Sequence, residues 1–145
     1  MCLDRDLTKN PLKRADIDIV CYKVVEVPYL KRYKSTTWLL RKLKCFKDYE
    51  TYYRRYPITF GKIFIAYPVF SEEELHFIDH NQHSIEEGFI HSFKNKDDAI
   101  KIAKRWTYID VVECIIPAGT YYFEGRNNGL TDGYASTQLK YVKVV

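Results

Sequence analysis

The sequence has few of the features that mark zinc-binding, secreted or membrane-spanning proteins. Its four cysteines, Cys2, Cys21, Cys45 and Cys114, show no Cys-x-x-Cys spacing, which argues against a zinc site or a redox pair. Apolar residues never run long enough for a membrane-spanning helix, which needs about 18 or more. Residues 1–14 are charged and contain no apolar stretch of the kind that a secretory signal requires. We therefore expect a cytoplasmic protein with no membrane partner.

Glycine is also scarce, and the six glycines form no phosphate-binding loop of the P-loop or dinucleotide type. The sequence accordingly predicts no cofactor. Aromatic residues, in contrast, make up 16% of the chain, and 13 residues are tyrosine. Because tyrosine packs its ring while keeping its hydroxyl in water, this excess indicates half-buried surfaces, a binding face, or both.

The alternation of apolar and polar residues predicts a single α+β domain. A length of 145 residues fits one domain. Residues 1–16 look like an irregular polar arm, and residues 17–145 would form the domain. Strands are expected at 17–27, 61–70, 88–93, 108–116, 120–123 and 134–145, with a hairpin or bent pair within 108–123 and a loop at 125–133. We expect a mixed, mostly antiparallel sheet with two or three helices packed on it.

Two helices have clear start signals. Ser71 precedes three consecutive glutamates, which is typical of a helix N-terminus, and that helix should extend to about Asn81. Asn95 should cap a second helix that extends through Trp106 and buries Ala99, Ile102, Ala103 and Trp106. A third helix over residues 38–53 competes with an extended basic loop.

The segment 29–56 is the most distinctive feature of the chain and resembles an insert. Residues 31–55 hold nine basic residues and two acidic ones, a local charge of +7, interleaved with aromatic residues. Cations beside stacking rings are what nucleotides and single-stranded nucleic acids require. The residues expected to bind such a ligand are Arg32, Lys34, Trp38, Arg41, Lys42, Arg54 and Arg55. The alternative is charge pairing with residues 71–98, whose local charge is −6.

Three further groups of residues could carry chemistry. Cys2 follows the initiator methionine, so loss of that methionine would place an α-amine beside a thiol nucleophile. His91 beside Ser92 could serve in acid–base catalysis, although a half-buried structural histidine is the stronger interpretation. His76, His80 and His83 have a spacing that could bind zinc or nickel, but they lie among acids and fit surface positions better, so no metal is predicted.

Several segments resemble a family of small proteins found in bacteriophages and gut Bacteroidetes. They are the Met-Cys-Leu start, CYKVV (21–25), EEGFIHSF (86–93), DDAIKIA (97–103), VVECIIPAGTYYFEG (111–125) and GYAS (133–136). The resemblance covers most of the chain outside 28–56. It implies a phage-type origin and no particular activity.

The order of these segments is also similar to that of toxin-type ADP-ribosyltransferases. In that family a first strand, a Ser-Thr-Ser-like strand, an alanine-rich helix and an Ile-Pro-x-Gly turn precede a strand that bears Glu-x-Glu. Here the corresponding residues are Gln138, Leu139 and Lys140. Because the family's glutamate stabilises the reacting ribose, this resemblance implies a related fold with a degenerate pocket.

The sequence thus favours a non-catalytic, phage-type accessory protein that engages an anionic partner through its basic aromatic segment. The partner could be a nucleotide, a nucleic acid or an acidic host protein. An enzyme that uses Cys2 or a degenerate transferase pocket is one alternative, and a structural or virion-associated protein is another. The sequence leaves the oligomeric state open.

Overall fold

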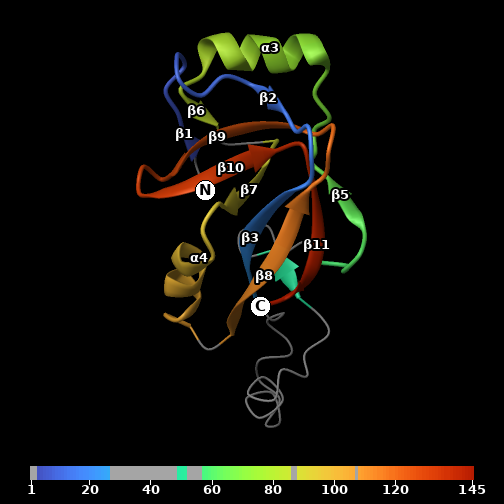
Figure 1. The fold of residues 1–145 in the computed structure, drawn as a ribbon, viewed down its shortest axis with the longest axis vertical. Coiled ribbons are helices and arrows are strands. Elements are labelled where there is room, and N and C mark those ends of the chain that lie inside the picture. Colours follow the sequence, from blue (N-terminus) through green and yellow to red (C-terminus); the bar gives the residue numbers. More distant parts are fainter. Residues whose placement is uncertain (1–2, 27–48, 52–56, 86–87, 107) are drawn as a thin grey trace.

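Antiparallel β-sheet dominates the computed structural model, which describes residues 3–26, 49–51, 57–85, 88–106 and 108–145 (Figure 1). Within these ranges the chain forms eleven strands and two helices, α3 (Glu72–Asn81) and α4 (Lys96–Ala103). The strands are β1 (Leu3–Asp4), β2 (Lys13–Arg14), β3 (Ile19–Glu26), β4 (Glu50–Thr51), β5 (Ile63–Ile65), β6 (Ser84–Ile85), β7 (Ile90–Phe93), β8 (Ile109–Ile116), β9 (Tyr121–Asn127), β10 (Thr131–Ser136) and β11 (Gln138–Val144). The antiparallel sheet with two helices agrees with the expectation, but the described residues are mostly β rather than evenly divided between helix and strand, as the α+β class would suggest.

The strands form one sheet with two differently oriented halves. Its order is β5-β11-β8-β3-β7-β10-β9-β1-β6, with β2 also on β9 and β4 also on β3. The halves meet between β3 and β7, where the register contains one residue pair, Tyr22 with Phe93. Figure 1 shows β9 and β10 running across the molecule while β3, β8 and β11 run along it. The sheet thus bends at the β3–β7 junction and encloses a core.

A long bent hairpin spans both halves. Strand β9 pairs with β10 and, beyond the bend, β8 pairs with β11. The expected pairing of strands within 108–123 is therefore wrong, because β8 and β9 follow each other through the turn at Pro117–Thr120 and lie in different halves. The expected loop at 125–133 is also wrong. Both strands continue to a tight turn, in which Asn128 and Gly129 adopt the positive φ angles that these residues tolerate (50° and 70°).

Local signals predicted both helix starts and the end of α3 correctly, but not the end of α4. Ser71 caps α3 in a capping box with Glu74, which confirms the predicted start, and α3 ends at Asn81 as expected. Helix α4 begins after Asn95, but it ends at Ala103 rather than Trp106. The backbone N–H of Arg105 bonds to the Ile102 carbonyl at 3.2 Å, which tightens the last turn and carries the chain away from the helix axis.

Three apolar clusters form the core. The largest lies on the inner face of β3, β8 and β11 and includes Cys21, Cys114 and Tyr141. A second packs α3 and β1 against Phe123 on β9. The third packs α4, through Ala99, against the outer face of β3 and β8. Cys21 and Cys114 face each other across β3 and β8 and are fully buried, as expected of core residues.

The N-terminal segment is built into the sheet rather than lying as an irregular arm. Strand β1 pairs with both β6 and β9, and β2 pairs with β9. Gly125 makes this close approach possible, because a Cβ atom at that position would collide with the Asp4 carbonyl. Leu3 is fully buried as a result.

The expected helix over 38–53 lies mostly outside the described residues. Within that range the structure describes residues 49–51, where Glu50 and Thr51 form β4. These residues pair with Val25 and Glu26 of β3 in antiparallel register. The helix is therefore wrong at this point, because backbone pairing with β3 satisfies the N–H and C=O groups that a helix would have bonded internally.

Candidate functional site

An open groove lies where α4 ends and β8 begins. Its volume is about 470 Å³, and α4 contributes Ile100 and Ala103 to it while β8 contributes Ile109, Asp110 and Val111. Lys104, Arg105 and Trp106 from the connecting turn and Val145 complete the lining. Ligand pockets in proteins have volumes of about 300–1,000 Å³, so the groove is large enough to hold part of a ligand.

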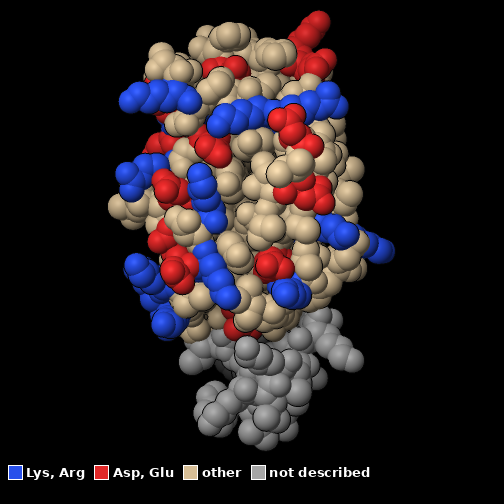
Figure 2. Space-filling view, viewed as in Figure 1, with Lys and Arg blue, Asp and Glu red and all other residues tan. Residues whose placement is uncertain are grey.

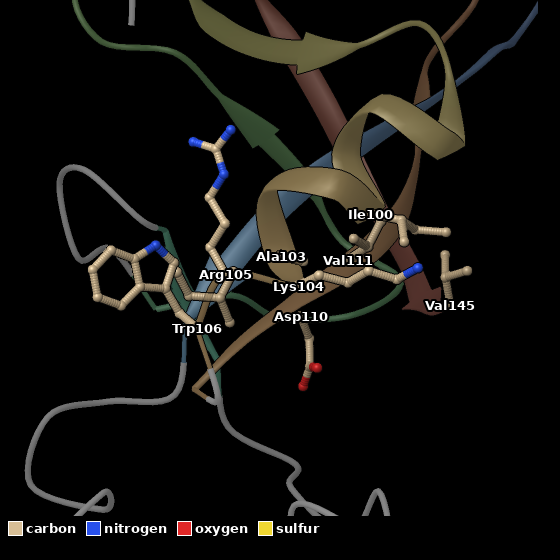
Figure 3. A pocket seen from close by; sticks show the side chains of 9 residues that line it. Ile100, Ala103, Lys104, Arg105, Trp106, Asp110, Val111 and Val145 are labelled. Atoms are coloured by element: carbon tan, nitrogen blue, oxygen red, sulfur yellow. The ribbon is translucent and has the colours of Figure 1, made fainter.

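The turn after α4 spreads three consecutive side chains around this groove. The backbone N–H groups of Lys104, Arg105 and Trp106 bond to carbonyls of residues 100, 102 and 103, which fixes the turn. Figure 3 shows Lys104 running toward Val145, while Arg105 and Trp106 extend on the other side of Ala103. The groove therefore has a cation on each side of an apolar floor.

Trp106 presents an unusually accessible aromatic ring. Its exposed fraction is 48%, although the sequence pattern predicted a buried position on α4. The Tyr108 ring lies beside it, with 6.0 Å between centroids and an angle of 36° between planes. Because large aromatic rings are normally buried, an exposed tryptophan beside a cation favours a role in binding.

Residues 27–48 include most of the basic segment, and the described residues on either side of them, Glu26 and Tyr49, both lie beside the groove. Glu26 pairs with Ile109 in the register of β3 and β8. The hydroxyl of buried Tyr49 donates a hydrogen bond to Asp110 at 3.0 Å. The two described residues on either side of 27–48 in the chain thus each lie next to a residue that lines the groove.

Most of the residues that the sequence predicted as functional lie outside the described part of the chain. They are Cys2, Arg32, Lys34, Trp38, Arg41, Lys42, Arg54 and Arg55. Their proposed roles in catalysis and ligand binding remain predictions.

The predicted histidines fall at separate places. His91 is buried on β7, with 7% of its surface exposed, and its carbonyl accepts a hydrogen bond from the Lys23 amine at 2.7 Å. His76 and His80 are exposed on α3, and His83 follows the helix end. Among the residues that the structure describes, no group of three or more His, Cys, Asp or Glu side chains could hold a metal ion.

The described thiols are poorly suited to nucleophilic catalysis. Burial raises the pKa of Cys21 to about 11, against the opposing effects of the Ser92 hydroxyl and Lys23. Burial also raises the pKa of Cys114 and lowers the pKa of the Lys23 amine. Both cysteines are therefore protonated at neutral pH, whereas attack requires the thiolate.

The segments that resembled the transferase motifs lie on strands that are not neighbours. His91 and Ser92 are on β7, which pairs with β10 and β3. Gln138, Leu139 and Lys140 are on β11, which pairs with β5 and β8. Leu139, moreover, is fully buried. In the order of the sheet, β3 and β8 separate these two segments.

Sequence reasoning missed Lys104, Arg105 and Trp106. The spacing of Trp106 from Ala99, Ile102 and Ala103 matches the apolar face of a continuing helix, so the pattern predicts a core position for Trp106. The signal that could have identified them is the sequence itself, since two consecutive cations followed by tryptophan repeat the basic and aromatic pattern of segment 29–56.

Comparison with known proteins adds no family. The chain matches no protein-family model, no curated protein and no solved structure, so neither resemblance noted in the sequence gains support. Among the described residues, none of the helices has the length and apolar character needed to cross a bilayer.

Proposed function

We propose that the protein is a non-catalytic binding protein that takes an anionic partner in the groove at the end of α4. The observation that carries this proposal is the exposed Trp106 ring with Lys104 and Arg105 on opposite sides of an apolar floor. Binding is favoured over catalysis because the described thiols are buried and protonated at neutral pH.

The charge distribution along α4 supports an anionic partner. Residues 94–106 contain five basic and two acidic residues, a local charge of +3. The acids, Asp97 and Asp98, lie in the first turn, while Lys101, Lys104 and Arg105 lie toward the groove. Figure 2 shows basic side chains at the side of the molecule where α4 lies in Figure 1. Positive potential is therefore concentrated at the groove end of the helix.

The basic segment would add to this surface. Its flanking residues Glu26 and Tyr49 lie beside the groove, and the segment holds Arg32, Lys34, Trp38, Arg41 and Lys42. Arg54 and Arg55 follow β4 in the chain. A partner that meets both surfaces would gain avidity from two linked contacts. A phage accessory role remains part of this proposal and depends on the sequence resemblance alone.

The test is a charge reversal at the groove with a matched control. The groove variant is Lys104→Glu with Arg105→Glu. The control is Lys94→Glu with Lys96→Glu, which changes the net charge by the same amount at the opposite end of α4. All four residues are exposed. Heparin serves as the anionic probe, and binding is measured by isothermal titration calorimetry over a series of salt concentrations.

We expect the groove variant to bind heparin about tenfold more weakly than the control, with a smaller salt dependence, because fewer cations contact the polyanion. Equal affinities for the two variants would contradict the proposal. The variant Arg54→Glu with Arg55→Glu separately tests the basic segment, and unchanged binding there would remove that segment from the interface.

A further inference from the structure

We infer that the protein forms a weak two-fold dimer in which strand β5 pairs with β5 of a second copy. This inference goes beyond the proposed function, since β5 contributes no residue to the groove. Three features of the described residues carry it. They are the outward-pointing backbone groups of β5, the apolar side chains that it exposes, and the charges at its two ends.

Strand β5 lies at one end of the sheet, and β11 is its neighbour among the described residues. The Ala66 N–H donates to the Thr137 carbonyl at 2.9 Å, in continuation of the β5–β11 register. Alternate residues of an antiparallel strand bond to the same neighbour, so Phe64 bonds to β11 as Ala66 does. The N–H and C=O groups of Ile63 and Ile65 therefore point away from β11, toward the sheet edge. A row of such groups is a template for another strand.

The side chains of β5 are unusually apolar for a sheet edge. Phe64 packs on Tyr141 in the core, so Ile63 and Ile65 lie on the opposite face, where they are 52% and 57% exposed. Exposed edges are normally protected by charged residues. A two-fold pairing centred on Phe64 places Ile63 beside Ile65 of the second copy, and these two residues exchange both backbone hydrogen bonds. The isoleucines of both copies are then covered together.

The charges at the two ends of β5 favour an antiparallel second copy. Lys62 precedes the strand, and Lys140 lies opposite Ile63 on β11. Beyond the other end, the chain leads to α3 and the three exposed glutamates of its first turn (Figure 1). Antiparallel pairing brings the cations of each copy toward the glutamates of the other, whereas parallel pairing brings like charges together. Antiparallel pairing about a two-fold axis also closes the assembly at two copies.

The ends of β5 limit how far this pairing extends. Gly61 has a φ angle of 82°, and Pro68 has no N–H to donate. The interface therefore covers less than the roughly 1,200 Å² of a standard stable complex. We accordingly expect a dissociation constant in the micromolar to millimolar range.

The experiment measures self-association of the full chain by sedimentation equilibrium from micromolar to millimolar concentration. The edge variant is Ile63→Lys with Ile65→Lys. The control is Ile17→Lys with Leu130→Lys, which adds the same charge at residues that are 74% and 75% exposed and lie outside β5. Urea unfolding verifies that each variant is folded. Amide hydrogen exchange by NMR at low and high protein concentration reports on the backbone of β5.

We expect the edge variant to dimerise at least about tenfold more weakly than the parent, and the control to dimerise as the parent does. The Ile63 and Ile65 amides of the parent should exchange more slowly at high concentration, while the Phe64 amide is protected at both. A parent that is monomeric at every concentration overturns the inference and leaves the edge to a strand of another protein.

Two other results also overturn it. One is equal dimerisation of the edge variant and the control, which places the interface elsewhere. The other is exchange at Ile63 and Ile65 that does not depend on concentration, which excludes pairing through β5. None of these results bears on the groove, whose role is tested separately by heparin binding.

Discussion

The guanidinium of Arg5 joins the N-terminal segment to the end of α3. Its side chain is fully buried, and its five N–H groups donate to the carbonyls of Asn10, Ile78, Asp79 and Gln82 and to the Asp79 carboxylate, at 2.6–3.0 Å. It also lies over the Phe123 ring, 4.5 Å from the centroid. Three of these carbonyls belong to the last turn of α3 or the residue after it, so one cation satisfies the acceptors at the helix end.

We predict that Arg5→Met lowers the free energy of unfolding by about 3–5 kcal/mol, because the Asp79 carboxylate loses its charge partner, although it retains the Leu12 N–H, and the carbonyls that Arg5 bonds lose a donor. Arg14→Met is the control. Arg14 is exposed, donates to the Gly119 carbonyl and lies over Tyr121, and its loss should cost less than about 1 kcal/mol. Urea denaturation measures both variants. Equal losses would show that the Arg5 contacts contribute little.

The two helices differ in how their N-termini are capped. Ser71 accepts a hydrogen bond from the Glu74 backbone N–H at 3.2 Å, and the Glu74 carboxylate accepts one from the Ser71 backbone N–H at 3.4 Å. At the start of α4 the Asn95 side chain bonds to the Asp98 carboxylate and makes no hydrogen bond to the helix backbone. The same sequence signal therefore corresponds to a formed cap in α3 and an unformed one in α4.

This difference predicts unequal costs for two similar substitutions. Ser71→Ala should lower the free energy of unfolding by about 1 kcal/mol, because it removes a partner of the first-turn N–H groups. Asn95→Ala should lower the free energy of unfolding by only about 0.3 kcal/mol, because its side chain makes no cap bond that could be lost. Chemical denaturation of the two variants under the same conditions provides the measurement. A larger loss for Asn95→Ala would contradict the assigned cap geometry.

Local features of the sequence predicted where helices and strands lie better than they predicted which strands pair. Ser71 with its three glutamates located α3, and the β-branched run around Val24 located β3, because these signals act within a few residues. The pairing of β8 with β11 was missed, because strand register depends on contacts distant in sequence. Trp106 was misplaced for a related reason. Its helical spacing was overridden by the turn that leads into β8, and the groove was missed with it.

At the scale of the whole molecule, helix α3 and strand β4 lie at different ends of the sheet (Figure 1). Helix α3, whose first turn holds Glu72, Glu73 and Glu74, covers one end of the sheet (Figure 1). Strand β4, which follows the basic segment, lies toward the other end beside β3. The described residue Tyr49 is thus closer to the groove than to α3.

Titrating groups in the core make the whole fold sensitive to alkali. Burial raises the pKa of Cys21 to about 11 and that of Tyr134 to about 12, and it also raises the pKa values of Cys114 and Tyr141. A raised pKa in the folded state means that the unfolded chain releases its proton first. Stability from these groups is therefore present below their ordinary pKa values and is lost as the pH rises through the raised ones. Lys23 acts in the opposite direction, because burial lowers its pKa and the unfolded chain retains its proton longer.

Cys21→Ala isolates one of these contributions. Between pH 9 and about 11 the parent should lose stability relative to the variant by about 1.4 kcal/mol per pH unit, since the ordinary pKa is 9.0 and the folded value is about 11. The cavity left by the substitution lowers stability by a similar amount at every pH, so it shifts the curve without changing this difference in slope. Urea midpoints from pH 7 to 11 measure both curves. Curves that stay parallel above pH 9 would mean that the Cys21 thiol ionises as readily in the folded protein as in the unfolded chain, and that it is not enclosed between β3 and β8 as the structure shows.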